Sequence, residues 1–304
     1  MKLFNAADST DFRAELGIMH QLRHPNVLNF YGAVTKGKRM QLVSERCACS
    51  VYQQLQRYGK LSKESGGAKL NLATRVRYAL DASKGMVFLH KRHIIHRDLK
   101  SSNLLIANDQ SKTVKICDFS FSRMQGHYEI TGVGLGTPGW VPPEETMGEL
   151  VTAKADVYSF AMILWELLQS EVPYAGLLFG ESVPESLQKL RLMEICAKDL
   201  RPPVPTEKAA WFQTPPPDFN MYCELMTDCW KREPELRPSF EVVQARLEVI
   251  HGRLKKRAQR KKRAERPSGR AATADAAGGA RNTESVEGSE AGAELHDEAN
   301  AQHE

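Results

Sequence analysis

The 304-residue sequence predicts an α+β fold, in which a few short strands precede a mostly helical body. Residues 27–34 and 39–44 are rich in strand-forming residues and are separated by a turn around Gly37. Several later segments instead carry apolar residues at helical spacing. Large apolar residues almost vanish beyond Gly252, so we expect the folded region to end near that residue.

Three segments have the periodicity of helices. Residues 12–22 place apolar side chains on one helical face, and His24-Pro25-Asn26 ends this pattern. Residues 72–89 form a longer amphipathic pattern. Residues 156–168 are apolar nearly all round, which predicts a helix in the centre of the body.

Charge is distributed unevenly near the C-terminus. The net charge of +5 is modest, but residues 253–266 carry nine basic residues and one acid, whereas residues 282–304 carry seven acids and no Lys or Arg. We expect residues 253–304 to form a disordered tail, first basic and then acidic. So few large apolar side chains cannot offset the entropy lost on folding. The start of this tail could extend the last helix.

The basic run has two interpretations. It could serve as a nuclear-import signal or bind an acidic surface, or it is a solvated helix end neutralised by the acidic tail. It lacks the interleaved aromatic residues of a specific nucleic-acid surface. We therefore expect a cytoplasmic protein, nuclear as well if the import interpretation holds, with no specific nucleic-acid partner.

Cysteine usage and hydropathy indicate an intracellular protein without a membrane span. The six cysteines are scattered, and no paired CxxC motif or His-rich stretch suggests a zinc site. No apolar run approaches the roughly 20 residues needed to cross a bilayer. Polar residues follow Met1-Lys2-Leu3-Phe4 directly, which does not resemble a secretory signal.

One loop carries the residues that phosphoryl transfer needs. Asp98 and Asn103 lie five positions apart, and Asp118 follows twenty positions after Asp98. One carboxylate can orient an attacking hydroxyl and accept its proton, while a second carboxylate and an amide oxygen can hold metal ions. Lys100, two positions after Asp98, can reach the same phosphate as a positive charge.

The segment His96-Arg97-Asp98-Leu99-Lys100-Ser101-Ser102-Asn103 resembles the catalytic loop of the eukaryotic protein kinase family. The resemblance extends over nearly all of residues 1–250. It implies a kinase domain at 1–252 with a two-lobed, protein-kinase-like fold. This fold would consist of a truncated N-lobe at 1–47 and a helical C-lobe at 48–252.

The resemblance also implies roles for the loop residues. Asp98 would be the catalytic base, with Lys100 beside it, and Asn103 and Asp118 would be metal ligands. ATP and Mg²⁺ would be the cofactors. The acceptor would be a serine or threonine hydroxyl of a protein substrate.

Further motifs resemble the structural framework of the family. Pro142-Pro143-Glu144 matches the end of the activation segment. Arg237 matches the arginine that pairs with this glutamate. Asp156 begins the central helix and would brace the backbone of the catalytic loop.

Two implied features concern regulation. His96 and Phe119 match members of a side-chain stack that joins the lobes. A phosphate added between Asp118 and Glu144 could pair with Arg97. The candidate acceptors in this stretch are Ser122, Tyr128 and Thr131.

The resemblance further implies which residues surround the nucleotide, from the hinge beside the adenine to the phosphates. The set comprises Lys2, Glu15, Ser44, Glu45, Cys47, Leu105 and Asp118. Glu15 matches the glutamate of the regulatory helix. Lys2, thirteen positions earlier, is either the ATP-binding lysine or a solvated terminal residue.

Two departures from the family pattern leave two functional hypotheses. No glycine-rich phosphate loop precedes Glu15, and the glycine-rich stretch at 132–137 lies in the activation segment. Ser120 replaces the glycine that follows Asp118-Phe119, which restricts the backbone. The chain is either an active kinase whose N-terminal strands are absent from this sequence or a pseudokinase that binds a partner or nucleotide. The intact catalytic set favours the kinase.

Short motifs indicate the subgroup. His24-Pro25-Asn26-Val27, Leu200-Arg201-Pro202-Pro203 and Cys229-Trp230 resemble the tyrosine-kinase-like group, which includes the Raf-like kinases. Acceptors in that group are mostly serine and threonine. Lys100 favours the same acceptors, because tyrosine kinases usually place Ala or Arg in this stretch.

Overall fold

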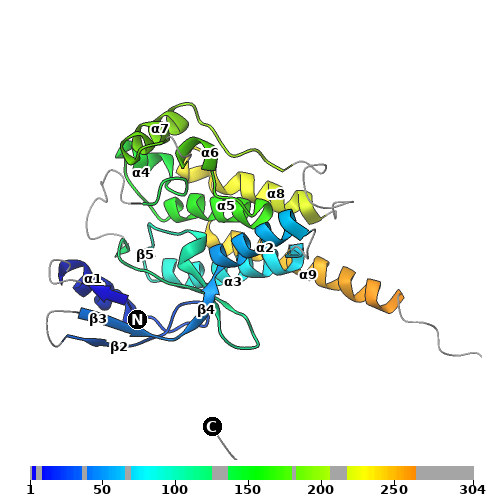
Figure 1. The fold of residues 1–304 in the computed structure, drawn as a ribbon, viewed down its shortest axis with the longest axis horizontal. Coiled ribbons are helices and arrows are strands. Elements are labelled where there is room, and N and C mark those ends of the chain that lie inside the picture. The colour runs from blue at the N-terminus through cyan, green and yellow to red at the C-terminus, as the bar shows by residue number, and fades with distance from the viewer. Residues whose placement is uncertain are drawn as a thin grey trace, which may run out of the picture. The chain divides into compact units, whose positions relative to one another are not determined.

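The computed structural model describes residues 2–4, 9–35, 40–65, 70–124, 136–179, 183–205 and 218–264 (Figure 1). The described residues up to Arg263 belong to one compact unit. Within this unit, short strands concentrate toward the N-terminus and helices make up most of the remainder. The predicted α+β class is confirmed.

A three-stranded antiparallel sheet forms the N-terminal part of this unit, with β3 in the middle. Its strands are β1 (Lys2–Phe4), β2 (Phe30–Val34) and β3 (Met40–Ser44). Helix α1 (Ser9–Met19) lies against β3. Its residues Phe12, Glu15 and Met19 recur every three or four positions and are all buried. Glu15 therefore lies on the covered face of the helix although it is charged.

Two further strand pairings hold the predicted site. The second antiparallel sheet has the order β4-β6-β7, and β5 pairs with β8. Because β5 ends before residues 96–103 and β6 begins directly after them, strand pairing anchors both ends of this loop. The strands are β4 (Cys47–Ser50), β5 (Ile94–Ile95), β6 (Leu104–Ala107), β7 (Val114–Ile116) and β8 (Arg123–Met124).

The helical body is built around α5 (Lys154–Gln169), which α3 and α8 contact (Figure 1). Every residue of α5 from Ala155 to Leu168 is buried, as its nearly continuous apolar sequence predicted. The other helices are α2 (Val51–Ser65), α3 (Leu72–His90), α4 (Pro143–Met147), α6 (Ala175–Leu178), α7 (Glu185–Ala197), α8 (Asp218–Cys229) and α9 (Phe240–Ala264), with the 3₁₀ turns η2 (Ser101–Asn103) and η3 (Pro234–Leu236).

The last helix extends into the basic run, as the sequence allowed. The folded region was predicted to end at residue 252 with residues 253–266 as a possible helical extension, and α9 continues to Ala264. The reason is that Leu254 continues the apolar face formed by Leu247 and Ile250 and is buried in the same core. The rest of the predicted tail, 265–304, lies outside the described residues.

Two boundaries near the N-terminus also differ from the prediction. The strand expected at 27–34 begins at Phe30, because Val27 forms an isolated bridge with Ile116 of β7 instead. The division expected after residue 47 cuts through β4, whose first residue already pairs with β6. Both differences arise because residues of the predicted N-lobe pair with strands of the predicted C-lobe. The sequence pattern does not show this pairing.

Among the described residues, no helix is both long enough and apolar enough to span a membrane. The six cysteines are free thiols.

Candidate active site

Asp98, Lys100 and Thr137 form a closed triangle of polar contacts. The Thr137 hydroxyl donates to Oδ1 of Asp98 at 2.7 Å, and Lys100 Nζ lies 2.8 Å from Oδ2 of the same carboxylate. Lys100 Nζ also donates to Thr137 Oγ1 at 2.6 Å. The contact from Thr137 shows that a hydroxyl can reach Asp98 within the distance that proton transfer to a general base requires. A cation stands beside the same position.

Asn103 is oriented by the backbone and side chain of Asp98. Its Nδ2 donates to the Asp98 carbonyl oxygen at 2.8 Å and to Oδ2 of Asp98 at 3.0 Å. Because the amide nitrogen is committed to these two acceptors, the amide oxygen is the part of the side chain that can face a metal ion.

Asp118 follows β7 with a positive φ of 67°, a conformation that turns the chain sharply. Within the described residues, no cluster of three or more His, Cys, Asp or Glu side chains forms a complete metal cage. A carboxylate and an amide oxygen nevertheless suit a divalent cation whose other ligands are phosphate oxygens and water. Asp118 and Asn103 therefore fit a metal that binds together with a phosphate-bearing substrate.

Asp156, at the start of α5, holds the catalytic loop by its backbone. Its Oδ2 accepts from the His96 amide at 2.9 Å, and its Oδ1 accepts from the Arg97 amide at 2.9 Å. His90 Nε2 lies 2.8 Å from Oδ2. Although burial opposes ionisation, the hydrogen bond and charge of His90 lower the pKa of Asp156. Asp156 therefore anchors the catalytic loop to α5, whose residues from Ala155 to Leu168 are all buried.

His96 and Phe119 connect the loop to the Asp118 segment. Their rings lie 5.4 Å apart between centroids, and His96 Nε2 lies 3.1 Å from the Cys117 carbonyl oxygen. Both residues are buried. The structure thus brings together the pair that was predicted to belong to one stack.

Glu144 and Arg237, predicted as partners 93 positions apart, form a bidentate pair with oxygen–nitrogen distances of 2.6 and 2.9 Å. Arg237 also donates to the carbonyl oxygens of Lys154, Lys231 and Arg232. Both side chains are buried. This pair joins α4 to the segment before α9.

Arg97 has a carboxylate partner within the described residues. Its Nη2 donates to Oε1 of Glu145 at 2.5 Å, and both side chains are buried. Burial raises the pKa of Glu145, and the charge of Arg97 opposes this shift. Arg97 had been predicted to pair with a phosphate. Here Glu145 supplies the negative charge.

The structure describes one of the three candidate phosphorylation sites. Ser122 is only 1% exposed, and its hydroxyl donates to the His96 carbonyl oxygen at 3.2 Å. A kinase cannot reach this hydroxyl in the present conformation, which argues against Ser122 as an acceptor. Tyr128 and Thr131 lie outside the described residues.

Two cavities that share Ser44 contain most of the predicted nucleotide residues. The larger, of about 780 Å³, is lined by Ser44, Glu45, Cys47 and Leu105 together with residues of β4 and α2. The smaller, of about 200 Å³, is lined by Ser44, Glu15, Asp118 and four other residues, including Leu42. The predicted set therefore follows one path from the β3–β4 connection to the metal ligands.

Lys2 is placed only by its backbone. It pairs with Leu42 across β1 and β3, and Leu42 lines the cavity that contains Glu15 and Asp118. Its side chain lies outside the described residues.

The Glu45 side chain at the β3–β4 connection is engaged by the protein. Glu45 Oε1 accepts from the Asn29 amide at 2.7 Å and lies 2.9 Å from Lys115 Nζ, so its carboxylate is already paired. Burial, followed by the charge of Glu45, raises the pKa of Cys47. A raised pKa lowers the thiolate fraction, so Cys47 is not an activated nucleophile.

Sequence reasoning missed several contacts. The sequence indicates Thr137 only as part of the glycine-rich stretch at 132–137, and it indicates no role for Glu145. The Ser120 hydroxyl was not expected to lie 3.0 Å from Glu15 Oε2 and 2.8 Å from Asp118 Oδ1. Most of these contacts join residues far apart in the chain, so no local motif indicates them.

Comparison with known proteins agrees with this geometry. Residues 2–247 match the model of the protein tyrosine and serine/threonine kinase family. The chain is 34% identical over 247 residues to the serine/threonine-protein kinase STY17 of Arabidopsis thaliana, covering 81% of this chain and 38% of the relative. It is 36% identical to the dual specificity protein kinase shkD of Dictyostelium discoideum, covering 79% and 29%.

The serine/threonine-protein kinase CTR1 of Arabidopsis thaliana is 35% identical, with 79% of this chain and 26% of the relative covered. The chain thus spans less than half the length of these curated relatives. The family model covers most of the folded unit, and the family prediction is confirmed. The chain belongs to the protein tyrosine and serine/threonine kinase family.

Proposed function

We propose that this chain is a protein serine/threonine kinase domain that transfers the γ-phosphate of ATP to a serine or threonine hydroxyl of a protein, with Mg²⁺ as the metal. The triangle of Asp98, Lys100 and Thr137, next to the metal-fitting pair Asn103 and Asp118, supports this proposal most directly. Names of relatives agree, since two of the three compared above are called serine/threonine kinases and the third a dual specificity kinase.

In the proposed mechanism Asp98 receives the acceptor hydroxyl where Thr137 now donates. It takes up the proton as the hydroxyl oxygen bonds to the γ-phosphorus and the bond from that phosphorus to the β-phosphate oxygen breaks, which releases ADP. Lys100 then faces the phosphoryl oxygens as a compact positive charge. Asn103 and Asp118 would hold the metal, which would neutralise charge on the phosphates. Asp156 keeps the loop backbone rigid while the proton moves.

The nucleotide would occupy the two cavities that share Ser44. Backbone groups near Glu45 and Cys47 would meet the adenine, with Leu105 on one side of the ring, and the phosphates would point toward Asp118. Lys2 would approach the phosphates from β1, since its strand partner Leu42 lines the smaller cavity.

A pseudokinase scaffold would not require this set of polar side chains. The set consists of Asp98, Lys100, Asn103 and Asp118, and its desolvation opposes folding without benefit to a binding module. The tyrosine-kinase-like, Raf-like assignment is also a proposal, supported by the similarity to CTR1 and STY17.

Exchange of Asp98 for Asn tests the proposed base. We expect Asp98→Asn to lower phosphate transfer to a mixed Ser/Thr peptide pool by about 10²–10⁴-fold, because the amide cannot accept the proton. ATP binding, measured by thermal shift with and without Mg²⁺, should persist.

Asp109→Asn, in the exposed loop after β6, is the matched control and should leave the rate unchanged. Transfer that survives Asp98→Asn at the native rate would remove the catalytic assignment. Absence of transfer by the native chain, with nucleotide binding intact, would instead favour the scaffold.

A further inference from the structure

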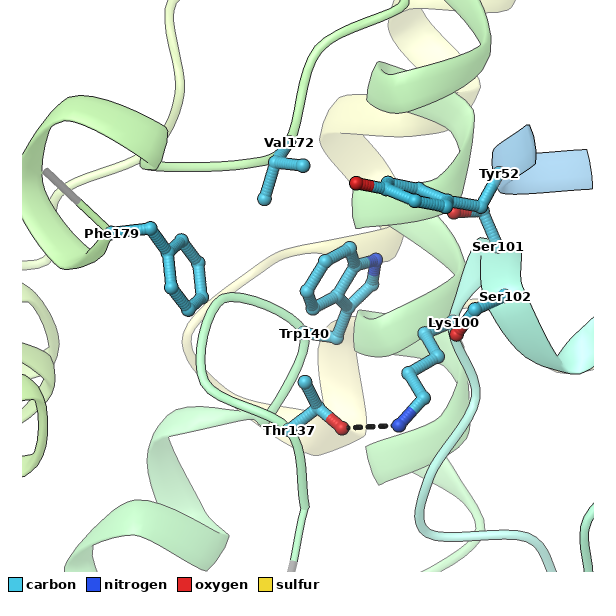
Figure 2. A pocket seen from close by; sticks show the side chains of 8 residues that line it. All are labelled: Tyr52, Lys100, Ser101, Ser102, Thr137, Trp140, Val172 and Phe179. Atoms are coloured by element: carbon cyan, nitrogen blue, oxygen red, sulfur yellow. Dashed lines mark hydrogen bonds between the residues drawn. The ribbon is translucent and has the colours of Figure 1, made fainter. Parts of the chain in front are cut away.

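A third cavity, of about 400 Å³, opens beside the catalytic loop and shares Tyr52 and Ser102 with the larger of the two cavities described above (Figure 2). Tyr52, Trp140, Val172 and Phe179 supply large apolar surfaces to its walls. In Figure 2 the rings of Tyr52 and Phe179 enter the cavity from opposite sides, with Trp140 between them. These walls come from three parts of the sequence, namely α2, the segment before α4, and the residues on either side of α6.

The cavity is continuous with the catalytic triangle. Lys100 and Thr137, which bond to each other at 2.6 Å, form one edge of the cavity and also contact Asp98. A protein segment that presents a hydroxyl to Asp98 must therefore pass this edge. An extended residue advances about 3.4 Å, so side chains within about three positions of the acceptor can enter the cavity.

Large parts of these apolar walls are available for contact. Phe179 is 41% exposed, and Val172 and Tyr52 are partly exposed. Covering such surface removes apolar area from water, which favours an apolar occupant.

The charges around the cavity disfavour a basic occupant. Lys100 is the charged side chain among the lining residues. Two buried acids contact its lining residues. Asp98 is paired with Lys100 at 2.8 Å and accepts from the Thr137 hydroxyl at 2.7 Å, and Glu166 accepts from the Ser101 hydroxyl at 2.6 Å and from Trp140 Nε1 at 2.7 Å. Glu166 is 1% exposed, and burial raises its pKa to about 8, so it offers no ionised partner to a cation at neutral pH.

We propose that this cavity binds an apolar side chain of the acceptor protein, close in sequence to the phosphorylated serine or threonine, and discriminates against a basic side chain at that position. The proposal rests on the proposed kinase function and specifies its substrate class. The occupant is the substrate segment because the cavity shares Lys100 and Thr137 with the site that receives the hydroxyl.

A peptide set tests this specificity. Each peptide carries one Ser or Thr acceptor, with Leu, Phe, Arg or Glu fixed at one position within about three residues of it. We expect one position at which Leu or Phe gives at least about tenfold higher kcat/KM than Arg, because the apolar walls then replace water.

Two variants of the cavity walls should change this preference, and two control variants should not. Val172→Asp places an ionised carboxylate on the wall and should shift the preferred residue from Leu to Arg. Phe179→Ala removes a wall and should reduce the preference for Phe. The controls are Val204→Asp, on an exposed loop, and Leu177→Ala, an exposed residue of α6. Neither lines the cavity, and both should keep the native preference.

The outcomes separate this inference from the kinase proposal. Efficient phosphorylation with equal use of Leu, Phe and Arg, or a preference that Val172→Asp leaves unchanged, would overturn the cavity assignment while the kinase function stands. If no peptide is phosphorylated, calorimetric titration of the same peptides into the Asp98→Asn protein decides the question. Tighter binding of Leu than Arg peptides, lost in Val172→Asp, supports the cavity, and equal binding refutes it.

Discussion

At the scale of single residues, Ser120 has a chemical connection that glycine at this position could not make. Its hydroxyl lies 2.8 Å from Asp118 Oδ1 and 3.0 Å from Glu15 Oε2, so one side chain bridges the metal-fitting carboxylate and the carboxylate of α1. The single hydroxyl proton can serve one carboxylate at a time. Ser120 therefore positions Asp118 relative to α1 rather than only restricting the backbone.

Removal of this hydroxyl should weaken metal use. We expect Ser120→Ala to raise the Mg²⁺ concentration for half-maximal activity about tenfold, since a hydrogen bond to a charged group contributes about 1.5–3 kcal/mol. Activity measured against Mg²⁺ concentration at saturating ATP checks this. Ser83→Ala, a buried serine of α3, controls for loss of a hydroxyl in general. An unchanged Mg²⁺ dependence in Ser120→Ala would show that the bridge does not position Asp118.

Glu166 should make stability depend on pH. Burial, opposed by hydrogen bonds from Ser101 and Trp140, raises its pKa from 4.5 to about 8. Below the lower value both folded and unfolded chains hold the proton. Between the two values only the unfolded chain releases it, so the free energy of unfolding falls as pH rises through this window.

We expect Glu166→Gln to remove this slope, because the amide stays neutral. Relative to the variant, the native protein should lose up to about 1 kcal/mol of stability per pH unit between about pH 5 and pH 8. Urea denaturation of both proteins across this range measures the difference. Glu224→Gln, an exposed residue of α8, should track the native curve. Parallel curves for native protein and Glu166→Gln would mean that the carboxyl is already ionised in the fold.

At the scale of elements, the pair of Glu144 and Arg237 fixes α4 to the chain before α9. Arg237→Met would leave the Glu144 carboxylate buried without its partner, which typically costs about 3–5 kcal/mol. We expect the urea midpoint to fall accordingly. The double variant Glu144→Gln with Arg237→Met should lose less than the sum of the single changes, because the two residues interact directly.

A second ion pair provides the control for this prediction. Arg246 and Asp228 lie 2.7 Å apart, but both side chains are about one-third exposed, at 31% and 36%. Arg246→Met should therefore cost about 1 kcal/mol or less. Equal losses for Arg237→Met and Arg246→Met would contradict the importance of burial.

At the scale of the whole molecule, the site consists of distant segments held against one central helix. The catalytic loop and the segment from Thr137 to α4 come from different parts of the chain. Asp156 of α5 supports the loop, Ser159 Oγ of the same helix donates to the Trp140 carbonyl oxygen, and Glu166 accepts from Trp140 and Ser101. One buried helix thus positions both the catalytic loop and the wall of the substrate cavity.

The amino-acid sequence by itself determined the features that depend on short-range pattern. The period of apolar residues predicted α3 and the central place of α5, and the spacing of Asp98, Asn103 and Asp118 indicated phosphoryl transfer. Family resemblance added the pairing of Glu144 with Arg237, which the structure brings together. Such signals lie within a few turns of chain or within a known motif, so a linear sequence carries them.

Only the tertiary structure decided the contacts that close around the loop. It placed the Thr137 hydroxyl on Asp98, gave Arg97 a carboxylate partner, and buried the Ser122 hydroxyl against the His96 backbone. It also gathered the apolar walls of the substrate cavity. Each of these depends on which distant segments pack together, and packing is a property of the whole core rather than of any short run of residues.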